Sequence, residues 1–302
     1  MQNLPSIIAI VGTNASGKSG LGVALAKQYA GEIISADSRQ VFEGLDLGSG
    51  KISKDEMQGV PHHLLNVCQP GDFFSMADFQ RMAYEAIDDI LARGKLPFLV
   101  GGTGLYVESV IEGYLLTGKM PDLQYRAELE KLDTATLFSM LKKEIPDVEI
   151  EAKNRNRVMR LLERLHDGDY HSPQRKRRYN TLRLGVTWER ETLCRRIDER
   201  LERRMAEGML EEVKGLLNAG VSEPFLLGLG LEYRLITQYV NDGFASEAKM
   251  LERLAISIKQ FAKRQMTWFR RDKEIHWLNM EQDPLAEACG IIDRFLEAGR
   301  KQ

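Results

Sequence analysis

One short segment near the start of the chain combines glycines, a lysine and a hydroxyl group at fixed spacing. The residues GTNASGKS at 12–19 match the pattern G-x-x-x-x-G-K-[ST], between an apolar run and a helical segment. Such a loop wraps a phosphate group with its backbone, neutralises it with the lysine and can ligate Mg²⁺ through the serine. A chance match in an ordinary turn is the alternative. We expect a pyrophosphate site formed by Gly12, Thr13, Asn14, Ala15, Ser16, Gly17, Lys18 and Ser19.

A second glycine-rich turn follows a later strand candidate, Leu96–Val100, which runs directly into GGTGLY at 101–106. A nucleoside triphosphatase carries an aspartate at this place to hold its metal ion and water. Thr103 supplies a hydroxyl group instead, and the sequence has no N-K-x-D motif for reading guanine. The pattern predicts a pyrophosphate-containing ligand, and it disfavours hydrolysis of ATP or GTP.

Asp37 follows another strand candidate, Glu32–Ala36, so it would lie at the carboxyl end of a sheet strand. Ligands bind at that edge in open α/β sheets. A carboxylate there can accept a proton from an attacking amine or hydroxyl group. We expect Asp37 to be the general base; the alternative is that Asp37 and Ser38 only cap a helix or turn.

Basic and aromatic side chains are interleaved near the end of the chain, in IKQFAKRQMTWFRR at 258–271. At helical spacing, Lys259, Lys263 and Arg264 lie near one another, and such cations suit phosphate contact. The aromatic residues are better explained as core. The sequence therefore predicts a helix with one basic face.

Charge is distributed unevenly along the chain. The formal net charge is −2, yet residues 153–204 contain 16 Lys and Arg against 8 Asp and Glu, which gives +8, while residues 1–152 give −8 and residues 205–302 give −2. A local positive field is typical of a protein that binds a polyanion. A solvated helix of mixed charge is the alternative.

These residues require a scaffold in which strands and helices alternate. The strand candidates are Ser6–Val11, Glu32–Ala36, His63–Val67, Leu96–Val100, Thr181–Thr187 and Ile275–Leu278, and the helix candidates are 17–29, 76–93, 189–219, 229–240 and 246–271. Alternation of this kind predicts an α/β fold, a P-loop doubly wound parallel sheet.

Between the fourth and fifth strand candidates the strand signal is lost. Residues 115–180 read as helices broken at Pro121, Pro146 and the polar stretch 167–174. We expect a catalytic core at 1–114 and 181–302, with an inserted, smaller all-helical subdomain at 115–180.

The composition excludes several classes of protein. No apolar stretch approaches the roughly 20 residues that span a bilayer, and MQNLPSIIAIVG lacks the basic region of a signal peptide, so we expect a cytoplasmic protein. The cysteines, Cys68, Cys194 and Cys289, lie too far apart for a C-x-x-C pair, which argues against a disulfide framework or a zinc site.

Taken together, these motifs resemble the bacterial tRNA dimethylallyltransferases, also called tRNA isopentenyltransferases, over nearly the whole chain. The resemblance rests on GTNASGKS at 12–19, ISADSRQVFEGLDLGSGK at 34–51, HHLLNV at 62–67, ADF at 77–79, VGGTGLY at 100–106, NRNRVMRLLE at 154–163, RIDERLERRMAEGMLEEV at 196–213 and AKRQMTWFR at 262–270.

The resemblance implies that the loop at 12–19 holds the pyrophosphate of dimethylallyl pyrophosphate with Mg²⁺, with Ser19 as the protein's metal ligand. Asp37 would be the base for the exocyclic amine of the adenosine at tRNA position 37, and Lys18 and Thr103 would be catalytic. The tRNA contacts would be Asp37, Ser38, Arg39, Gln40, Thr103, Arg126, Asn156, Arg157, Val158, Met159, Arg160, Lys263 and Arg264. The inserted helices would clasp the anticodon stem-loop, and we expect neither a membrane nor an obligate protein partner.

The chain departs from the family pattern at three places. Thr13 and Asn14 stand where a proline is usual, the stretch I-G-Y-[KR]-[EQ] reads LGLGLEYR at 227–234, and Ile258 and Lys259 replace Thr-Arg. Three other activities remain open: prenylation of free adenine nucleotides, phosphorylation of a small molecule, and RNA binding without catalysis. The positive segment disfavours prenylation of free nucleotides, and the GGTGLY turn disfavours phosphorylation of a small molecule. The presence of Lys18, Ser19, Asp37 and Thr103 together disfavours RNA binding without catalysis.

Overall fold

The computed structural model describes residues 4–116, 122–168 and 174–300, which form two compact units. The first consists of Met1–Gly113 and Lys176–Gln302, and the second of Tyr114–Arg175. Residues 176–180, which we expected in the insertion, belong to the first unit, and Tyr114, which we expected in the core, belongs to the second. Lys176 donates its backbone N–H to the carbonyl of Gly113 at 2.8 Å, and Tyr179 lies in the core beneath the sheet.

The first unit is built on one six-stranded, all-parallel sheet with the order β3-β2-β4-β1-β5-β6, which confirms the expected α/β class. Its strands are β1 (Ser6–Gly12), β2 (Glu32–Ser35), β3 (His62–His63), β4 (Pro97–Gly101), β5 (Asn180–Thr187) and β6 (Ile275–Asn279). Strand β1 is central, and its Ile8 aligns with Phe98 on one side and with Leu182 on the other. The carboxyl ends of β1, β2 and β4 therefore share one edge.

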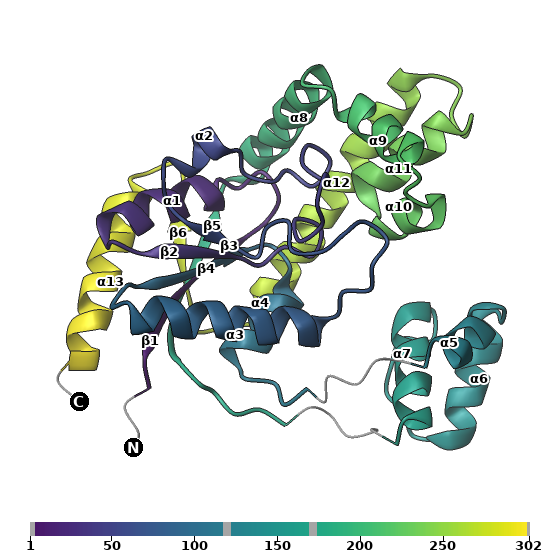
Figure 1. Ribbon diagram of the computed structural model, residues 1–302, viewed down its shortest axis with the longest axis horizontal. Helices are drawn as coiled ribbons and strands as arrows, with labels where there is room; N and C mark the ends of the chain where they lie inside the picture. The colour runs from purple at the N-terminus through teal and green to yellow at the C-terminus, as the bar shows by residue number, and fades with distance from the viewer. Residues whose placement is uncertain (1–3, 117–121, 169–173, 301–302) are drawn as a thin grey trace. The chain divides into compact units, whose positions relative to one another are not determined.

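Helices cover both faces of the sheet (Figure 1). They are α1 (Lys18–Gln28), α3 (Met76–Ala92), α4 (Gly104–Ile111) and α13 (Pro284–Arg300), whereas the short α2 (Lys54–Met57) has no buried residue. Phe79 of α3 and Val110 of α4 are buried on one face, while Leu25 of α1 and Ile292 of α13 are buried on the other. Burying β-branched and aromatic side chains on both sides is what a parallel sheet requires.

A group of helices beyond the sheet has its own apolar core, centred on Tyr233 and Leu254. These helices are α8 (Arg190–Ala206), α9 (Met209–Asn218), α10 (Glu223–Leu229), α11 (Leu231–Val240) and α12 (Glu247–Phe269). Helix α12 connects the two cores, because Leu254 lies in the helical core and Phe269 in the core of the sheet.

Two expectations about the elements are wrong for identifiable backbone reasons. The single helix expected at 189–219 is interrupted at Gly208, whose φ is 100°. The helix expected at 229–240 is present as α11, and Gly230, with φ 72°, separates it from α10. The strand expected at His63–Val67 is only His62–His63, since Leu64 and Asn66 have φ angles of 63° and 54°. A left-handed conformation ends the extended chain there.

The second unit contains α5 (Leu123–Glu130), α6 (Thr134–Glu144) and α7 (Arg155–His166). Its core includes Leu137, Leu141 and Leu162. The breaks expected at Pro121 and within 169–173 fall outside the described residues. No helix in the described parts of the chain combines the length and the apolar character that crossing a membrane requires.

Candidate active site

The phosphate-binding loop follows β1 and ends where α1 begins at Lys18. Its sharp turn uses Ala15 with φ 59° and Gly17 with φ 84°. A Cβ atom at Gly12 would come within 2.6 Å of Val186 Cγ2, so only glycine allows β1 and β5 to lie this close at the loop. The sequence pattern of the loop therefore reflects backbone geometry.

Two side chains, one just after β5 and one from α8, hold the loop from outside. Trp188 donates its indole N–H to the carbonyl of Ser16 at 2.8 Å, and Arg196 donates Nε–H to the carbonyl of Ala15 at 3.1 Å. These donors neutralise carbonyl oxygens that would otherwise repel an anionic ligand. The amide groups at the start of α1, with the positive end of the helix dipole, favour a phosphate.

Gln265 of α12 joins this loop to the second glycine-rich turn. Its buried amide accepts the backbone N–H of Asn14 at 2.9 Å and donates to the carbonyl of Gly102 at 2.9 Å. A Cβ atom at Gly101 would lie 2.1 Å from the carbonyl oxygen of Ala36. The ends of β1, β2 and β4 are thereby packed backbone against backbone.

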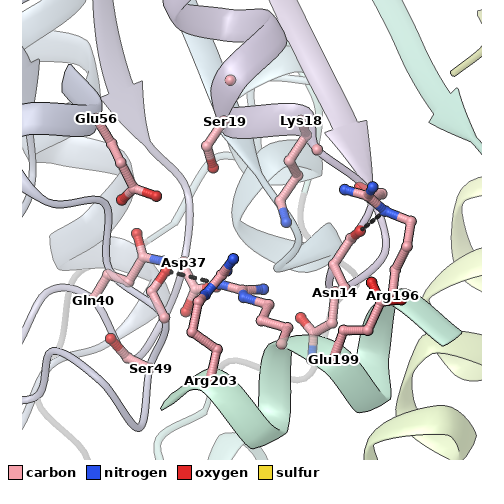
Figure 2. Close-up of a pocket in the computed structure, with 16 residues that line it drawn as sticks. Asn14, Lys18, Ser19, Asp37, Gln40, Ser49, Glu56, Arg196, Glu199 and Arg203 are labelled. Atoms are coloured by element: carbon pink, nitrogen blue, oxygen red, sulfur yellow. Dashed lines mark hydrogen bonds between the residues drawn. The ribbon is translucent and has the colours of Figure 1, made fainter. Parts of the chain in front are cut away.

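A cavity of about 270 Å³ opens beside the loop. Lys18, Ser19 and Asp37 all line it, as expected, and Figure 2 shows Lys18 from α1 and Arg203 from α8 extending toward its middle. Of the eight loop residues assigned to pyrophosphate, Asn14, Ala15, Ser16, Gly17, Lys18 and Ser19 line the cavity. Gly12 and Thr13 are buried behind the loop, where the carbonyl of Thr13 accepts a hydrogen bond from Lys18 Nζ at 3.3 Å.

Three arginines of α8 that our sequence reasoning placed only in the positive segment 153–204 also line the cavity: Arg196, Arg200 and Arg203. Their spacing of four and then three residues places them on one face of the helix. That spacing is visible in RIDERLERR at 196–204 and was the available signal. Asp37 and Lys18 thus face a row of guanidinium groups.

Four cations line the cavity, Lys18 and three arginines of α8, together with the carboxylates of Asp37, Glu56 and Glu199. Burial lowers the pKa of Lys18 to about 8, although the charge of Asp37 opposes the shift, and Arg200 and Arg39 lower this pKa further. Burial and the neighbouring Arg204 lower the pKa of Arg200 to about 10. Cations that depress one another's pKa values favour a ligand with several negative charges, which a pyrophosphate supplies.

Asp37 lies just beyond β2 and has two roles in the geometry. Its Oδ1 accepts the backbone N–H of Arg39 at 3.0 Å, so it closes a turn, and its carboxylate also lines the cavity. Thr103, just beyond β4, accepts the backbone N–H of Ser38 at 3.1 Å through Oγ1. The two candidate catalytic residues are therefore held on adjoining, hydrogen-bonded turns.

The side chains of Arg39 and Gln40, which we expected to contact tRNA, bind other residues of the protein. Arg39 is 8% exposed, and its guanidinium forms an ion pair with Glu232 at 2.7 Å. Gln40 accepts a hydrogen bond from Ser35 Oγ at 3.0 Å and donates to the carbonyl of Gly50 at 3.2 Å. The turn closed by Asp37 is therefore followed by two side chains, Arg39 and Gln40, whose contacts stabilise the fold.

A second hollow, a groove of about 840 Å³, lies between α10–α11 and α12 and reaches Ser38 and Arg39. Arg264, one of the expected RNA contacts, lines it, and Lys263 is exposed on the same helix. Arg234 and Arg253 also line the groove, and our sequence reasoning missed both. Its aromatic and cationic lining matches the requirements of an unpaired nucleotide.

In the second unit, the expected RNA-contact segment 156–160 is divided between core and surface. Val158 and Met159 are 0% and 6% exposed, and their side chains belong to the core of that unit. Asn156, Arg157 and Arg160 are exposed on α7. Helical periodicity produces this division.

Arg126 and Arg160 share one acidic partner in that unit. Arg126 lies 3.2 Å from Glu163 Oε1, and Arg160 lies 3.0 Å from Glu163 Oε2. Both arginine side chains nevertheless remain about half exposed, at 41% and 55%. Their charges are available to a polyanion even though one carboxylate orients them.

The donor groups of the cavity fit a magnesium ion that is bound mainly by its substrate. Ser19 supplies a hydroxyl group, and the carboxylates of Asp37 and Glu56 line the same space. Among the described residues no group of three or more His, Cys, Asp or Glu could hold a metal by itself. Mg²⁺ usually keeps several waters and binds through substrate phosphates with one or two protein oxygens, so a sparse set is sufficient.

Comparison with known proteins agrees with this geometry. The family model described as IPP transferase matches residues 40–272, and that described as isopentenyl transferase matches residues 5–68. A tRNA dimethylallyltransferase 2 of Shewanella sediminis is 42% identical, with 95% of this chain and 97% of that protein covered. A tRNA dimethylallyltransferase of Geobacillus thermodenitrificans is 41% identical, with 96% and 95% covered.

Solved structures lead to the same assignment. The tRNA isopentenylpyrophosphate transferase of Bacillus halodurans superposes with a TM-score of 0.76 at 36% identity, and 98% of each chain is covered. A eukaryotic dimethylallyltransferase acting on tRNA gives a TM-score of 0.80 at 25% identity, with 97% of this chain and 80% of that chain covered. The resemblance inferred from the motifs is confirmed: the chain belongs to the tRNA dimethylallyltransferase family.

Proposed function

We infer that this protein transfers a dimethylallyl group to tRNA, from dimethylallyl pyrophosphate to the exocyclic amine of the adenosine at position 37, next to the anticodon. One observation carries the proposal: a single cavity contains both the phosphate-binding loop and the carboxylate of Asp37. A phosphate grip beside a proton acceptor suits the displacement of pyrophosphate by a nucleophile that must lose a proton.

The positive residues of the cavity stabilise the departing pyrophosphate. In the reaction the bond between the allylic carbon and the pyrophosphate oxygen breaks, and the oxygen keeps the electron pair. Lys18 and the α8 arginines face the charge that develops there, and such preorganised electrostatic stabilisation is usually the largest part of catalysis. A Mg²⁺ ion held by Ser19 would neutralise a further part of the pyrophosphate charge.

Asp37 receives the proton in this mechanism. The lone pair of the adenosine amine forms the new carbon–nitrogen bond, and the proton that the nitrogen releases goes to the carboxylate. Because one Asp37 oxygen is fixed by the backbone N–H of Arg39, the carboxylate is oriented before substrate binds. Thr103 is tied to the same turn through Ser38, and in this proposal it would contact the substrates from there.

Two positive surfaces support tRNA as the acceptor. The groove that reaches Ser38 contains Arg234, Arg253 and Arg264, and the second unit exposes Arg157 and Arg160 on α7. A base in the anticodon loop has to leave its stack to reach Asp37, at a cost of about a few kcal/mol that phosphate contacts offset. We place the reaction in the cytoplasm, because its proposed acceptor is tRNA.

Acceptor competition tests the proposal. The protein is incubated with labelled dimethylallyl pyrophosphate, Mg²⁺ and either unmodified tRNA or AMP, and the product is digested and weighed by mass spectrometry. We expect label on the amine of adenosine 37, with AMP a poor acceptor and no label in a control reaction without the protein. Preferential prenylation of AMP would show that the protein acts on free adenine nucleotides. In a parallel incubation with ATP, phosphate release without any prenyl transfer would show that it is a kinase or phosphatase.

A further inference from the structure

Glu232 forms the centre of a buried ion cluster behind the active site. It lies in the first turn of α11 and is 2% exposed. Its two carboxylate oxygens lie 2.7 Å from Arg39 Nη1 and 3.3 Å from Arg204 Nη1. The cluster connects the turn that carries Asp37 with α11 and α8.

The carboxylate of Glu232 is ionised. Burial alone would raise the pKa of Glu232, but Arg39 and Arg204 outweigh burial, so its pKa is lowered. A buried carboxylate between two guanidinium groups keeps its charge, and each guanidinium is then oriented by it. The orientation of the Arg39 side chain therefore depends on Glu232.

Arg39 is bound at both of its ends. Its backbone N–H donates to Asp37 Oδ1 at 3.0 Å, while its guanidinium points away to Glu232. Asp37 nevertheless contributes to raising the pKa of Arg39, so the two charges are within electrostatic reach. Without Glu232, the nearest carboxylate on the same turn is that of Asp37.

The cluster also borders the phosphate-binding loop. A small cavity of about 20 Å³, large enough for one water molecule, is lined by Asn14 and Ala15 of the loop together with Arg39, Arg204 and Glu232. Nε and Nη2 of Arg204 are buried and form no hydrogen bond to any described residue. The ion cluster therefore lies directly behind the site of the reaction.

We propose that Glu232 is a positioning residue of the transfer reaction: it holds the Arg39 guanidinium away from Asp37 and so leaves that carboxylate free to accept the proton. The proposal rests on the proposed role of Asp37. It gives a function to the stretch 227–234, where the chain departs from its family's usual pattern. If the guanidinium were released, it would pair with Asp37 and make it a weaker base.

The test uses one variant and two matched variants of the full chain. Glu232→Gln preserves size and removes the charge. Arg204→Gln disturbs the same buried cluster but leaves the pair between Arg39 and Glu232. The double variant Arg39→Gln/Glu232→Gln also removes the guanidinium that Glu232→Gln releases. Thermal unfolding and pyrophosphate titration show that each variant is folded and keeps its phosphate site.

Single-turnover transfer to a saturating anticodon stem-loop is the readout. We expect Glu232→Gln to be slower by about 100-fold, as for a small displacement of a catalytic group, with pyrophosphate affinity within about twofold of the parent. Arg204→Gln should lose less than about tenfold, and the double variant should be at least about tenfold faster than Glu232→Gln. Recovery in the double variant distinguishes positioning from a loss of structure.

Two results would overturn the proposal: transfer by Glu232→Gln at the parental rate, or a double variant no faster than Glu232→Gln. If Glu232→Gln does not fold, the double variant decides, since the proposal requires its rate to lie within about tenfold of Arg204→Gln, and a slower rate refutes it. Absence of transfer by the parental protein would refute the proposed function itself and is thereby distinguished from failure of the role of Glu232.

Discussion

The lowered pKa of Lys18 predicts how pyrophosphate binding depends on pH. Burial shifts this pKa from 10.5 to about 8, so in the free protein half of the Lys18 side chains are neutral near pH 8. A pyrophosphate beside the amine favours the charged form. Binding above pH 8 must therefore take up a proton at Lys18, and binding below it need not.

The size of the effect follows from the shift. Keeping Lys18 charged in the folded, ligand-free protein costs about 3 kcal/mol, a cost that is present below pH 8 and fades as the pH rises toward 10.5. For the complex, the proton uptake weakens apparent affinity by about tenfold for each pH unit above 8. Between about pH 7 and about pH 9, the titration of Lys18 alone should weaken the apparent affinity for pyrophosphate by nearly tenfold.

Lys18→Arg is the matched variant, because a guanidinium stays charged throughout this range. Calorimetric titration of both proteins with pyrophosphate, in two buffers of different ionisation enthalpy, measures affinity and proton uptake together. Titration of the ligand itself is common to both proteins and cancels in the comparison. The parent should take up nearly one proton more than Lys18→Arg at about pH 9. If the parent and Lys18→Arg take up the same number of protons and show the same pH profile, the pKa of Lys18 is not lowered and the reasoning is refuted.

Three further predictions concern the base, the RNA surface and the sheet. Asp37→Asn should still bind both substrates but slow single-turnover transfer by roughly 10²- to 10⁴-fold; a parental rate would reduce Asp37 to a turn residue. Changing Arg157 and Arg160 to Glu should weaken tRNA binding, reduce its salt dependence and leave pyrophosphate affinity intact, and unchanged tRNA affinity would argue for solvation only. Arg93 lowers the pKa of buried Glu32, and two further basic partners lower this pKa despite burial. The ionised Glu32 therefore stabilises the fold at pH values above the usual carboxyl pKa, and this stabilisation is lost as the pH falls. Glu32→Gln should therefore cost roughly 3 kcal/mol in urea unfolding at neutral pH and progressively less in acid, whereas a loss independent of pH would contradict the assignment.

Local chain geometry explains which parts of the site were predictable. The spacing of Gly12, Gly17, Lys18 and Ser19 is imposed by the turn itself, so eight consecutive residues were enough to identify it. Asp37 was recognisable because its position depends only on where β2 ends. The parallel sheet followed from the alternation of strands and helices.

Contacts between distant segments were not predictable in the same way. Gln265 joins two loops that are far from it in the sequence, and Glu232 meets Arg39 across most of the chain. Both contacts form because the polar side chains are buried, and a single sequence does not show whether a polar side chain is buried. The length of β3 was predicted wrongly for a different reason: Leu64 adopts a left-handed backbone conformation that its residue type disfavours.

The central position of β1 has a consequence for how the chain folds. Strand β1 must pair with β4 on one side and with β5 on the other, and β5 follows only after the whole second unit. Closing so long a loop is entropically costly, and contacts of high sequence separation slow folding. During synthesis, one edge of an almost wholly apolar strand remains unpaired until Asn180–Thr187 has left the ribosome, while the second unit already has a complete core of its own. The pairing of β1 with β5 therefore forms after the second unit is complete, and until then this edge of the nascent sheet is exposed to misassociation.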